Sequence, residues 1–286
     1  MSYIFQCGRF DFDLSPLSMP LVMGVLNVTP DSFSDGGRFR DLDAALSRAE
    51  QMIADGVDII DIGGESSRPG ATPVPLEQEL ARIMPVIYAL RDCGKPLSID
   101  TFKPVVMREA LAAGADMIND IRGFQEPGAV EAITQSDCGL CLMHMQNLPQ
   151  TMQAAPHYED ITCEVTTFLH RQVGKLDAAG IGRNRLCVDP GFGFGKTHLH
   201  NVTLWQNLGR VQNMLALPLL IGVSRKAMIG ELTGRAPGDR MVGSVAAALA
   251  AAAHGARIVR VHDVAETVDA FAIWHALRPT IHHQTS

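Results

Sequence analysis

Residues 185–197 read RLCVDPGFGFGKT, an apolar run that ends at Asp189 and is followed by a glycine-rich loop. The last three residues, Gly195 to Thr197, form the tripeptide with which a P-loop holds phosphate, so a nucleotide site is the first hypothesis. The P-loop pattern requires a glycine five residues before the Gly-Lys pair, and Pro190 occupies that position. The spacing therefore argues against a P-loop and indicates a buried strand whose loop has another purpose.

The same unit of strand, loop and helix recurs along the whole chain. Short apolar runs cover residues 21–28, 57–63, 95–101, 115–121, 139–145, 185–190, 218–224 and 257–263. Segments with helical spacing lie around 42–54, 76–91, 104–113, 128–136, 163–179, 202–214, 241–253 and 265–277. Strict alternation of strands and helices in eight units predicts an α/β protein that is a single (β/α)8 TIM barrel. An open doubly wound sheet is the alternative.

The composition is that of one enzyme domain. The chain has 286 residues, and we expect one domain over 1–286, with a barrel core at about 20–278 after a short N-terminal extension. A net charge of −7 argues against a nucleic-acid partner. Because the sequence has neither a long apolar window nor a signal-like start, we expect a cytoplasmic protein without a membrane partner. The pair at 138–141, CGLC, has no second pair and is expected to pack in the core.

Nearly every expected strand ends in a polar or ionisable side chain. These residues are Asn27, Asp61, Asp100, Asn119 with Asp120, His144, Asp189, Ser224 and His262. In a barrel the C-terminal ends of the strands converge on one face, where the following loops build the active site. The sequence therefore predicts one polar site at that face.

The strand-end residues indicate two kinds of recognition. Asp100, Asn119 and Asp189 offer the acceptors and donors that a flat, nitrogen-rich ring requires, although a carboxylate pair for a metal or for acid–base work, or a structural capping role, stays open. Lys226, Arg260 and His262 concentrate positive charge, which favours an anionic group such as phosphate. Asn27 is an oxygen ligand, and oxygen ligands beside phosphate suit Mg²⁺.

Two loops at the same face have the composition of lids. Residues 27–38, NVTPDSFSDGGR, and residues 63–75, GGESSRPGATPVP, are long and contain the aromatic Phe33 and the cationic Arg68. Long loops over a barrel mouth commonly close on a substrate, although solvated connectors have similar composition.

The motifs taken together resemble those of the dihydropteroate synthase family. MGVLNVTPDSFSDGG, DIGGESSRPGA, SIDTFKP, INDI, MHMQ, DPGFGFGKT, GVSRKAMIG and RVHDV occur in order over roughly residues 5–278. The resemblance implies a barrel that joins 6-hydroxymethyl-7,8-dihydropterin diphosphate to 4-aminobenzoate, giving 7,8-dihydropteroate and diphosphate. It also implies Mg²⁺, competition by sulfonamides and a homodimer.

Carried over position by position, the resemblance implies a role for each site residue. The pterin ring would contact Asp100, Asn119, Asp189 and Lys226, and diphosphate would contact Asn27 with its metal, Arg260 and His262. Aminobenzoate would contact Ser67, Arg68, Pro69, Phe192 and Ser224, with Phe33 and Asp31 closing over it. Asp31, Arg68 and Lys226 would act in catalysis, by a substitution in which the leaving group departs first. The family usually has threonine where this chain has Ser67, so we expect a modest change of contact there.

Two alternatives share the ring pocket. A pterin-dependent methyltransferase domain with a corrinoid partner has no need of the basic cluster or of the first loop. A non-catalytic pterin-binding regulator is expected to have lost Asp31, Arg68 or Lys226, and all three are present.

Overall fold

Eight parallel strands form the barrel that the alternation predicts. The computed structural model describes residues 3–29, 38–68 and 70–277. The strands pair in the order β8 (Leu186–Asp189), β7 (Gly139–Met143), β6 (Met117–Asp120), β5 (Leu97–Asp100), β4 (Ile59–Gly63), β3 (Leu21–Asn27), β10 (Ile258–Val261) and β9 (Leu220–Ile221). A parallel bridge between Val188 and Leu219 joins the two ends of this order, which brings the sheet back on itself. The TIM-barrel prediction is confirmed.

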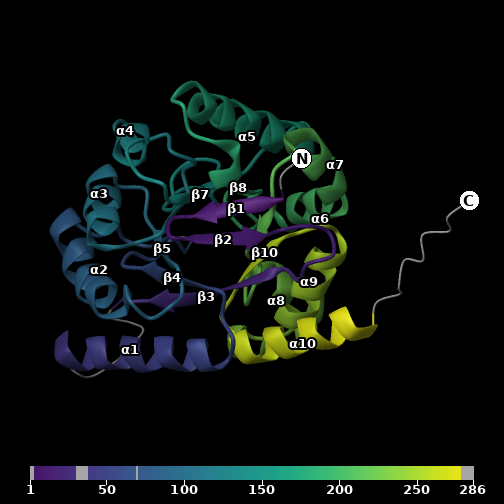
Figure 1. Cartoon of the computed structure of the whole chain (residues 1–286). Coiled ribbons are helices and arrows are strands. Elements are labelled where there is room, and N and C mark those ends of the chain that lie inside the picture. The colour runs from purple at the N-terminus through teal and green to yellow at the C-terminus, as the bar shows by residue number, and fades with distance from the viewer. Residues whose placement is uncertain (1–2, 30–37, 69, 278–286) are drawn as a thin grey trace, which may run out of the picture.

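Helices surround the strands (Figure 1). They are α1 (Arg38–Ala54), α2 (Leu76–Leu90), α3 (Pro104–Ala113), α4 (Ala129–Ile133), α5 (Ile161–Ala178), α6 (His198–Gln206), α7 (Leu208–Leu215), α8 (Ala227–Thr233), α9 (Met241–Ala253) and α10 (Val264–Leu277). The helix expected at 202–214 is two helices, because Asn207 leaves the helical conformation with φ −107° and ψ 14°. The short helix α8 was not expected from the sequence.

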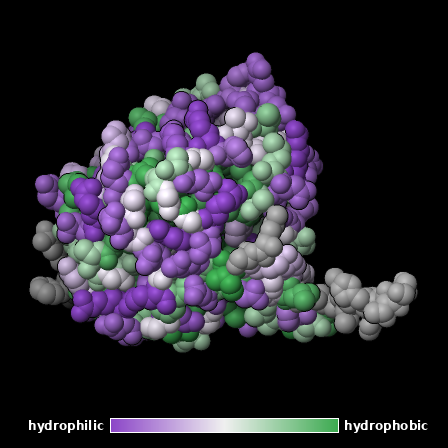
Figure 2. Space-filling model, turned by 45° about the horizontal axis from the view of Figure 1, so that its top comes forward, coloured by the Kyte–Doolittle hydropathy of each residue, from purple (hydrophilic) through white to green (hydrophobic). Residues whose placement is uncertain are grey.

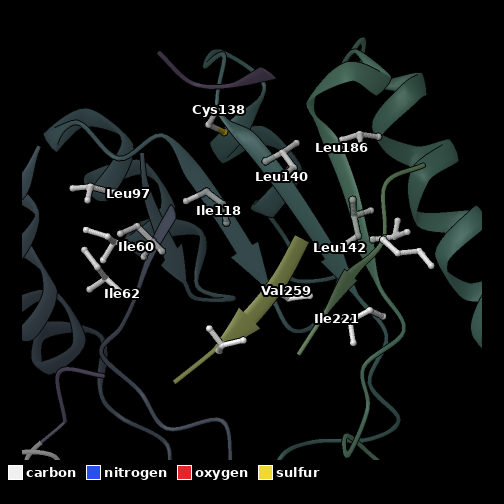
Figure 3. Packing of buried hydrophobic residues seen from close by; sticks show 14 of the residues in the cluster. Ile60, Ile62, Leu97, Ile118, Cys138, Leu140, Leu142, Leu186, Ile221 and Val259 are labelled. Atoms are coloured by element: carbon white, nitrogen blue, oxygen red, sulfur yellow. The ribbon is translucent and has the colours of Figure 1, made fainter. Parts of the chain in front are cut away.

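Side chains alternate along each strand between the barrel interior and the helix layer. Ile60, Ile118, Leu140, Leu142 and Val259 belong to one cluster of buried residues that packs between the strands and the helices (Figure 3). The intervening residues of the same strands point into the barrel. Because both faces of each strand are buried, the strands are continuous apolar runs. Polar residues occur mainly near the strand ends at the site.

An antiparallel hairpin lies across the N-terminal end of the barrel (Figure 1). Strands β1 (Ile4–Cys7) and β2 (Phe10–Asp13) form it, and the sequence had suggested only a short extension. Phe5 and Cys7 share a buried cluster with Met23, Met117 and Leu220, which lie in the barrel interior. The hairpin therefore seals the lower part of the barrel with apolar side chains.

The face of the molecule in Figure 2 is mostly hydrophilic, with small apolar patches between the polar side chains. Among the described residues, no helix combines the length and the apolar character that a membrane span requires.

Loss of the seal should destabilise the barrel. Phe5 is 1% exposed, so Phe5→Ala removes a large side chain from a packed cluster and should lower the free energy of unfolding by about 3 kcal/mol. Tyr3, on the same hairpin, is 52% exposed, and Tyr3→Ala is the matched control with little expected effect. Urea denaturation followed by circular dichroism measures both. Equal effects of the two variants would contradict the sealing role.

Candidate functional site

An arginine shared by two carboxylates occupies the centre of the barrel. Arg260 of β10 donates from Nε to Asp61 Oδ2 at 2.6 Å and from Nη2 to Asp100 Oδ2 at 2.8 Å. Ser98 donates to Asp61 Oδ1 at 2.7 Å, and Asn119 Nδ2 lies 3.3 Å from Asp61 Oδ2. Strands β4, β5, β6 and β10 thus meet in one polar network above the apolar floor.

Burial and charge act in opposite directions on the ionisable groups of this network. Burial disfavours the charged guanidinium of Arg260, but Asp61 and Asp100 outweigh that cost and raise its pKa. Burial raises the pKa of Asp100 to about 7, with Arg260 opposing and Asp61 adding to the rise. Arg260 is therefore always charged, whereas Asp100 can gain or lose a proton near neutral pH.

Asp189 and Lys226 form the opposite wall of the mouth. Asp189 Oδ1 accepts from the backbone N–H of Gly191 at 2.7 Å. Lys226 Nζ donates to the carbonyl of Phe192 at 2.7 Å and lies 4.4 Å from the centre of the Phe194 ring. Burial lowers the pKa of Lys226 to about 8, with Asp189 opposing. The ammonium is held where an aromatic face and a carboxylate meet.

Two glycines lie beside these side chains, at distances where an added Cβ would make ordinary van der Waals contact. A Cβ on Gly222 would lie 3.6 Å from Arg260 Cβ and 3.8 Å from Asp189 Oδ2. A Cβ on Gly63 would lie 3.5 Å from Asn27 Oδ1. The second distance places the amide of Asn27 at the mouth, beside the end of β4.

Positive charge gathers around His262. Burial, together with the charges of Arg260, Arg225 and Arg68, lowers the pKa of His262 to about 4, with Asp263 opposing. The ring nitrogen Nδ1 lies 3.1 Å from the hydroxyl of Ser224. A neutral histidine among several cations is suited to a multiply charged anion, which would offset their mutual repulsion.

Some strand-end residues do not face the mouth. Asp120 accepts from the backbone N–H groups of Arg122 and Phe124, each at 2.7 Å, and holds the turn after β6. His144 lies behind the loop that follows β8. Arg225, which follows the strand-end residue Ser224, donates from Nε to Asp263 at 3.1 Å and is engaged within the protein. A polar residue at a strand end therefore indicates a site only when its side chain also points into the barrel.

Three predicted contacts lie outside the described residues: Asp31 and Phe33 of the first loop and Pro69 of the second. Of the second loop, Ser67 lines a recess together with Asp100 and Thr101, and Arg68 is exposed.

The two aromatic residues of the GFGF run lie in different layers, although only Phe192 is expected from the resemblance to contact aminobenzoate. Phe192 is 1% exposed and stacks against Trp205 of α6 with ring centres 5.4 Å apart. It therefore belongs to the layer under the helices. Phe194 clusters with Met143, Met145 and other buried residues and carries Lys226 on its face. We expect Phe194, rather than Phe192, to contact a ligand at the mouth.

The lysine of the Gly-Lys-Thr tripeptide binds its own loop. Lys196 is 3% exposed, and its Nζ donates to the carbonyls of Gly191 at 2.8 Å and Phe194 at 3.2 Å. His144 Nδ1 lies 2.9 Å from the same nitrogen. A Cβ on Gly191, where φ is +73°, would meet the carbonyl oxygen of His144 at 1.9 Å, so this position requires glycine.

The threonine of the same tripeptide begins the next helix. Thr197 caps α6, accepting from the backbone N–H of His200 while the His200 side chain accepts from Thr197 N. Lysine and threonine are thus both engaged in shaping the wall of the mouth, and the spacing argument against a P-loop agrees with this arrangement.

The sequence also left several residues of the network unassigned. Asp61 was noted as a strand-end residue but received no role, and its spacing of two from Gly63 is the signal that places it inside the barrel. Ser98 has the same signal, a spacing of two from Asp100. Lys196 has none, because its bonds to Gly191 and Phe194 depend on how its loop turns.

Comparison with known proteins gives consistent matches. Residues 23–262 match the family model described as pterin binding enzyme. A dihydropteroate synthase of Neisseria meningitidis serogroup C is 50% identical over 279 residues, covering 96% of this chain and 98% of the relative.

Solved structures of the same kind superpose closely. The dihydropteroate synthase of Xanthomonas albilineans with 4-aminobenzoic acid has a TM-score of 0.90 at 48% identity, covering 98% of this chain and 100% of that one. That of Burkholderia cenocepacia, complexed with 7,8-dihydropteroate, has a TM-score of 0.86 at 50% identity and covers 96% of each chain. That of Yersinia pestis, in a sulfonamide drug complex, has a TM-score of 0.87 at 48% identity, covering 96% and 98%.

The buried lysine should make stability depend on pH. Burial lowers the pKa of Lys196 to about 7, so between that pH and the ordinary lysine pKa the unfolded chain holds a proton that the folded chain lacks. Stability contributed by this residue therefore rises with pH. From about pH 7.5 to about pH 9.5, the free energy of unfolding of the wild type should gain roughly 2 kcal/mol relative to Lys196→Met.

Urea denaturation at the two pH values measures this difference. Lys175→Met, which removes an exposed lysine of α5, is the control and should run parallel to the wild type. Parallel curves for Lys196→Met as well would mean that Lys196 has an ordinary pKa in the folded protein.

Proposed function

The chain belongs to the pterin-binding enzyme family, with dihydropteroate synthases as its relatives over nearly its whole length, and we propose that its barrel mouth performs their reaction. The reaction joins 6-hydroxymethyl-7,8-dihydropterin diphosphate to 4-aminobenzoate, releasing diphosphate and 7,8-dihydropteroate. One observation carries this proposal: at the barrel mouth, carboxylate and amide groups that can hydrogen-bond a pterin ring lie next to a cluster of cations that can bind diphosphate. The comparisons support this function rather than a methyltransferase domain or a non-catalytic paralogue.

The pterin ring would lie against the polar network. Asp100, Asn119 and Asp189 present carboxylate and amide groups for its ring edge, and Lys226 would donate to a ring acceptor. Arg260 holds Asp100 in place, so the pocket is fixed before the ligand arrives. Fixed donors and acceptors bind a ligand without the cost of ordering them at that moment.

The diphosphate would lie at the cationic rim, near Asn27, Arg260 and His262. The leaving group departs from a CH₂ beside an electron-rich ring, which can delocalise a developing positive charge. Bond breaking can therefore run ahead of attack by the weakly nucleophilic arylamine. The task of the rim is to hold the departing anion and to keep water out, which is electrostatic preorganisation.

Asn27 suits a metal that arrives with the substrate. Among the described residues there is no group of three or more His, Cys, Asp or Glu side chains that could hold an ion by themselves. Mg²⁺ is commonly bound by one protein oxygen, substrate phosphates and waters, and the Asn27 amide oxygen beside Gly63 fits that role. When bound, the ion would neutralise charge on the departing diphosphate.

The arylamine would enter over the second loop. Ser67 and Arg68 of that loop and Ser224 at the end of the β9 segment border the mouth, and Phe194 supplies an aromatic wall. Asp31, Phe33 and Pro69 complete the proposed set from the family resemblance alone. Sulfonamides, which share the shape of aminobenzoate, would compete for this place.

Two further properties are proposed with the activity. Leu232, Val242, Ile273 and Leu277 are exposed apolar side chains on α8, α9 and α10, and α9 contacts both neighbours, so this surface would pair two copies of the chain. The six cysteines are free, which agrees with a reducing, cytoplasmic location.

Diphosphate release is the direct test of the activity. Purified chain with both substrates and Mg²⁺ should release diphosphate, and omission of either substrate should abolish the release. Asp189→Ala should lose activity by at least about a hundredfold, because a buried partner of the ring is removed, whereas Lys175→Met should retain it. A folded wild-type protein that releases no diphosphate would refute the proposed function.

Diphosphate binding should be coupled to protonation of His262. The free histidine is neutral at pH 6, because its pKa lies at about 4, and a bound anion raises that pKa. Binding at about pH 6 should therefore take up more protons in the wild type than in His262→Gln. Calorimetry in two buffers of different ionisation enthalpy measures the uptake. Identical uptake by both proteins would place the anion away from His262.

A further inference from the structure

A lysine outside the mouth joins both ends of the second loop. Lys103 follows β5 and directly precedes α3. Its Nζ donates to Glu65 Oε2 at 2.5 Å, near the start of the loop, and to the carbonyl of Val74 at 2.6 Å, near its end. The third donor goes to Glu79 Oε2 of α2 at 2.5 Å. All three N–H groups of the ammonium are therefore used within the protein.

The partners of Lys103 are themselves fixed. Glu79 is 1% exposed, and its other oxygen accepts from the Thr101 hydroxyl at 2.7 Å. Burial raises the pKa of Glu79, and Lys103 opposes that rise. Arg82 of α2 donates to the carbonyl of Gly64 at 2.7 Å. The start of the loop is thus attached to α2 and to the end of β5, which are rigid parts of the barrel.

Ser67 and Arg68 lie only two and three residues beyond Glu65. The backbone between the two attachment points carries these residues, and Glu65, Ser66 and Ser67 border the same recess as Asp100 and Glu79. A short segment with both ends fixed has few conformations, so its side chains are placed before a ligand binds.

We propose that Lys103 is a positioning residue for aminobenzoate, acting through the ends of the loop that carries Ser67 and Arg68. This inference rests on the proposed function, because it takes these two residues to contact the arylamine. The three N–H groups of Lys103 are all used within the protein, so none is left to donate to substrate. The second loop then differs from a freely closing lid, because both of its ends are fixed.

Steady-state kinetics on two variants test the proposal. With two variants, the test still holds if one of them does not fold. Glu65→Ala removes the contact at the start of the loop but leaves Lys103 bonded to Val74 and paired with buried Glu79. The double variant Lys103→Met with Glu79→Gln removes the lysine without leaving an unpaired buried carboxylate. Each should raise the KM for aminobenzoate about tenfold or more, since small misplacement of a binding group is costly. The affinity for a pterin analogue should change by less than about twofold.

Conservative and remote variants serve as controls. Lys103→Arg keeps the charge and the donors, so its KM for aminobenzoate should stay within about threefold of the wild type. Lys175→Met should match the wild type in both constants. Circular dichroism and the unfolding midpoint establish that each variant is folded.

The outcomes separate this proposal from the proposed function. An inactive wild type refutes the function itself, whereas an active wild type with an unchanged aminobenzoate KM in both test variants refutes the role of Lys103 alone. Equal losses in aminobenzoate and pterin affinity would also overturn it, because they would show general damage to the barrel mouth. A selective rise in the aminobenzoate KM that Lys103→Arg avoids is the result expected.

Discussion

The sharing of Arg260 between Asp61 and Asp100 is the constraint on which the rest of the site depends. Charges in a barrel interior must be paired, because an isolated one would lose its hydration without compensation. One guanidinium between two carboxylates leaves the cluster with more acceptors than donors. Ser98 and Asn119 supply part of the difference. Acceptor capacity remains on Asp100, which lines the recess at the mouth. A ligand ring rich in N–H groups could donate to it.

This polar network can exist because the two ends of the barrel are built differently. Below it, Met23, Met117 and Leu220 pack with Phe5 of the hairpin and exclude water. Above it, glycines such as Gly63 and Gly222 leave space instead of filling it. A barrel filled evenly with branched side chains would have no room for a ligand. A ligand site in this barrel therefore requires that one end is packed with apolar side chains and the other is left open.

The sequence was sufficient for the barrel and for the inward-facing residues that end the strands. Period-two alternation places Asp100, Asn119 and Asp189 on one face without reference to a structure. It could not distinguish Phe192 from Phe194, because positive φ values at Gly191 and Gly193 interrupt that period in the loop. The partners of Lys103 and Lys196 were equally hidden. The bonds of Lys103 depend on how separate segments fold against each other, and those of Lys196 depend on how its own loop turns. No period-two pattern records either.

Lys196 and Lys103 illustrate one physical rule, although Lys196 is buried and Lys103 is only half-buried. A P-loop turns its backbone N–H groups toward phosphate and leaves its lysine free to join them. In the loop after β8, glycines in the left-handed region let the carbonyls of Gly191 and Phe194 turn toward Lys196 instead. Those carbonyls occupy the ammonium, so it cannot serve an external anion. Lys103 is occupied in the same way by two glutamates and a carbonyl. The acceptors around each ammonium, rather than the motif that contains it, therefore decide whether it binds substrate or shapes the wall that does.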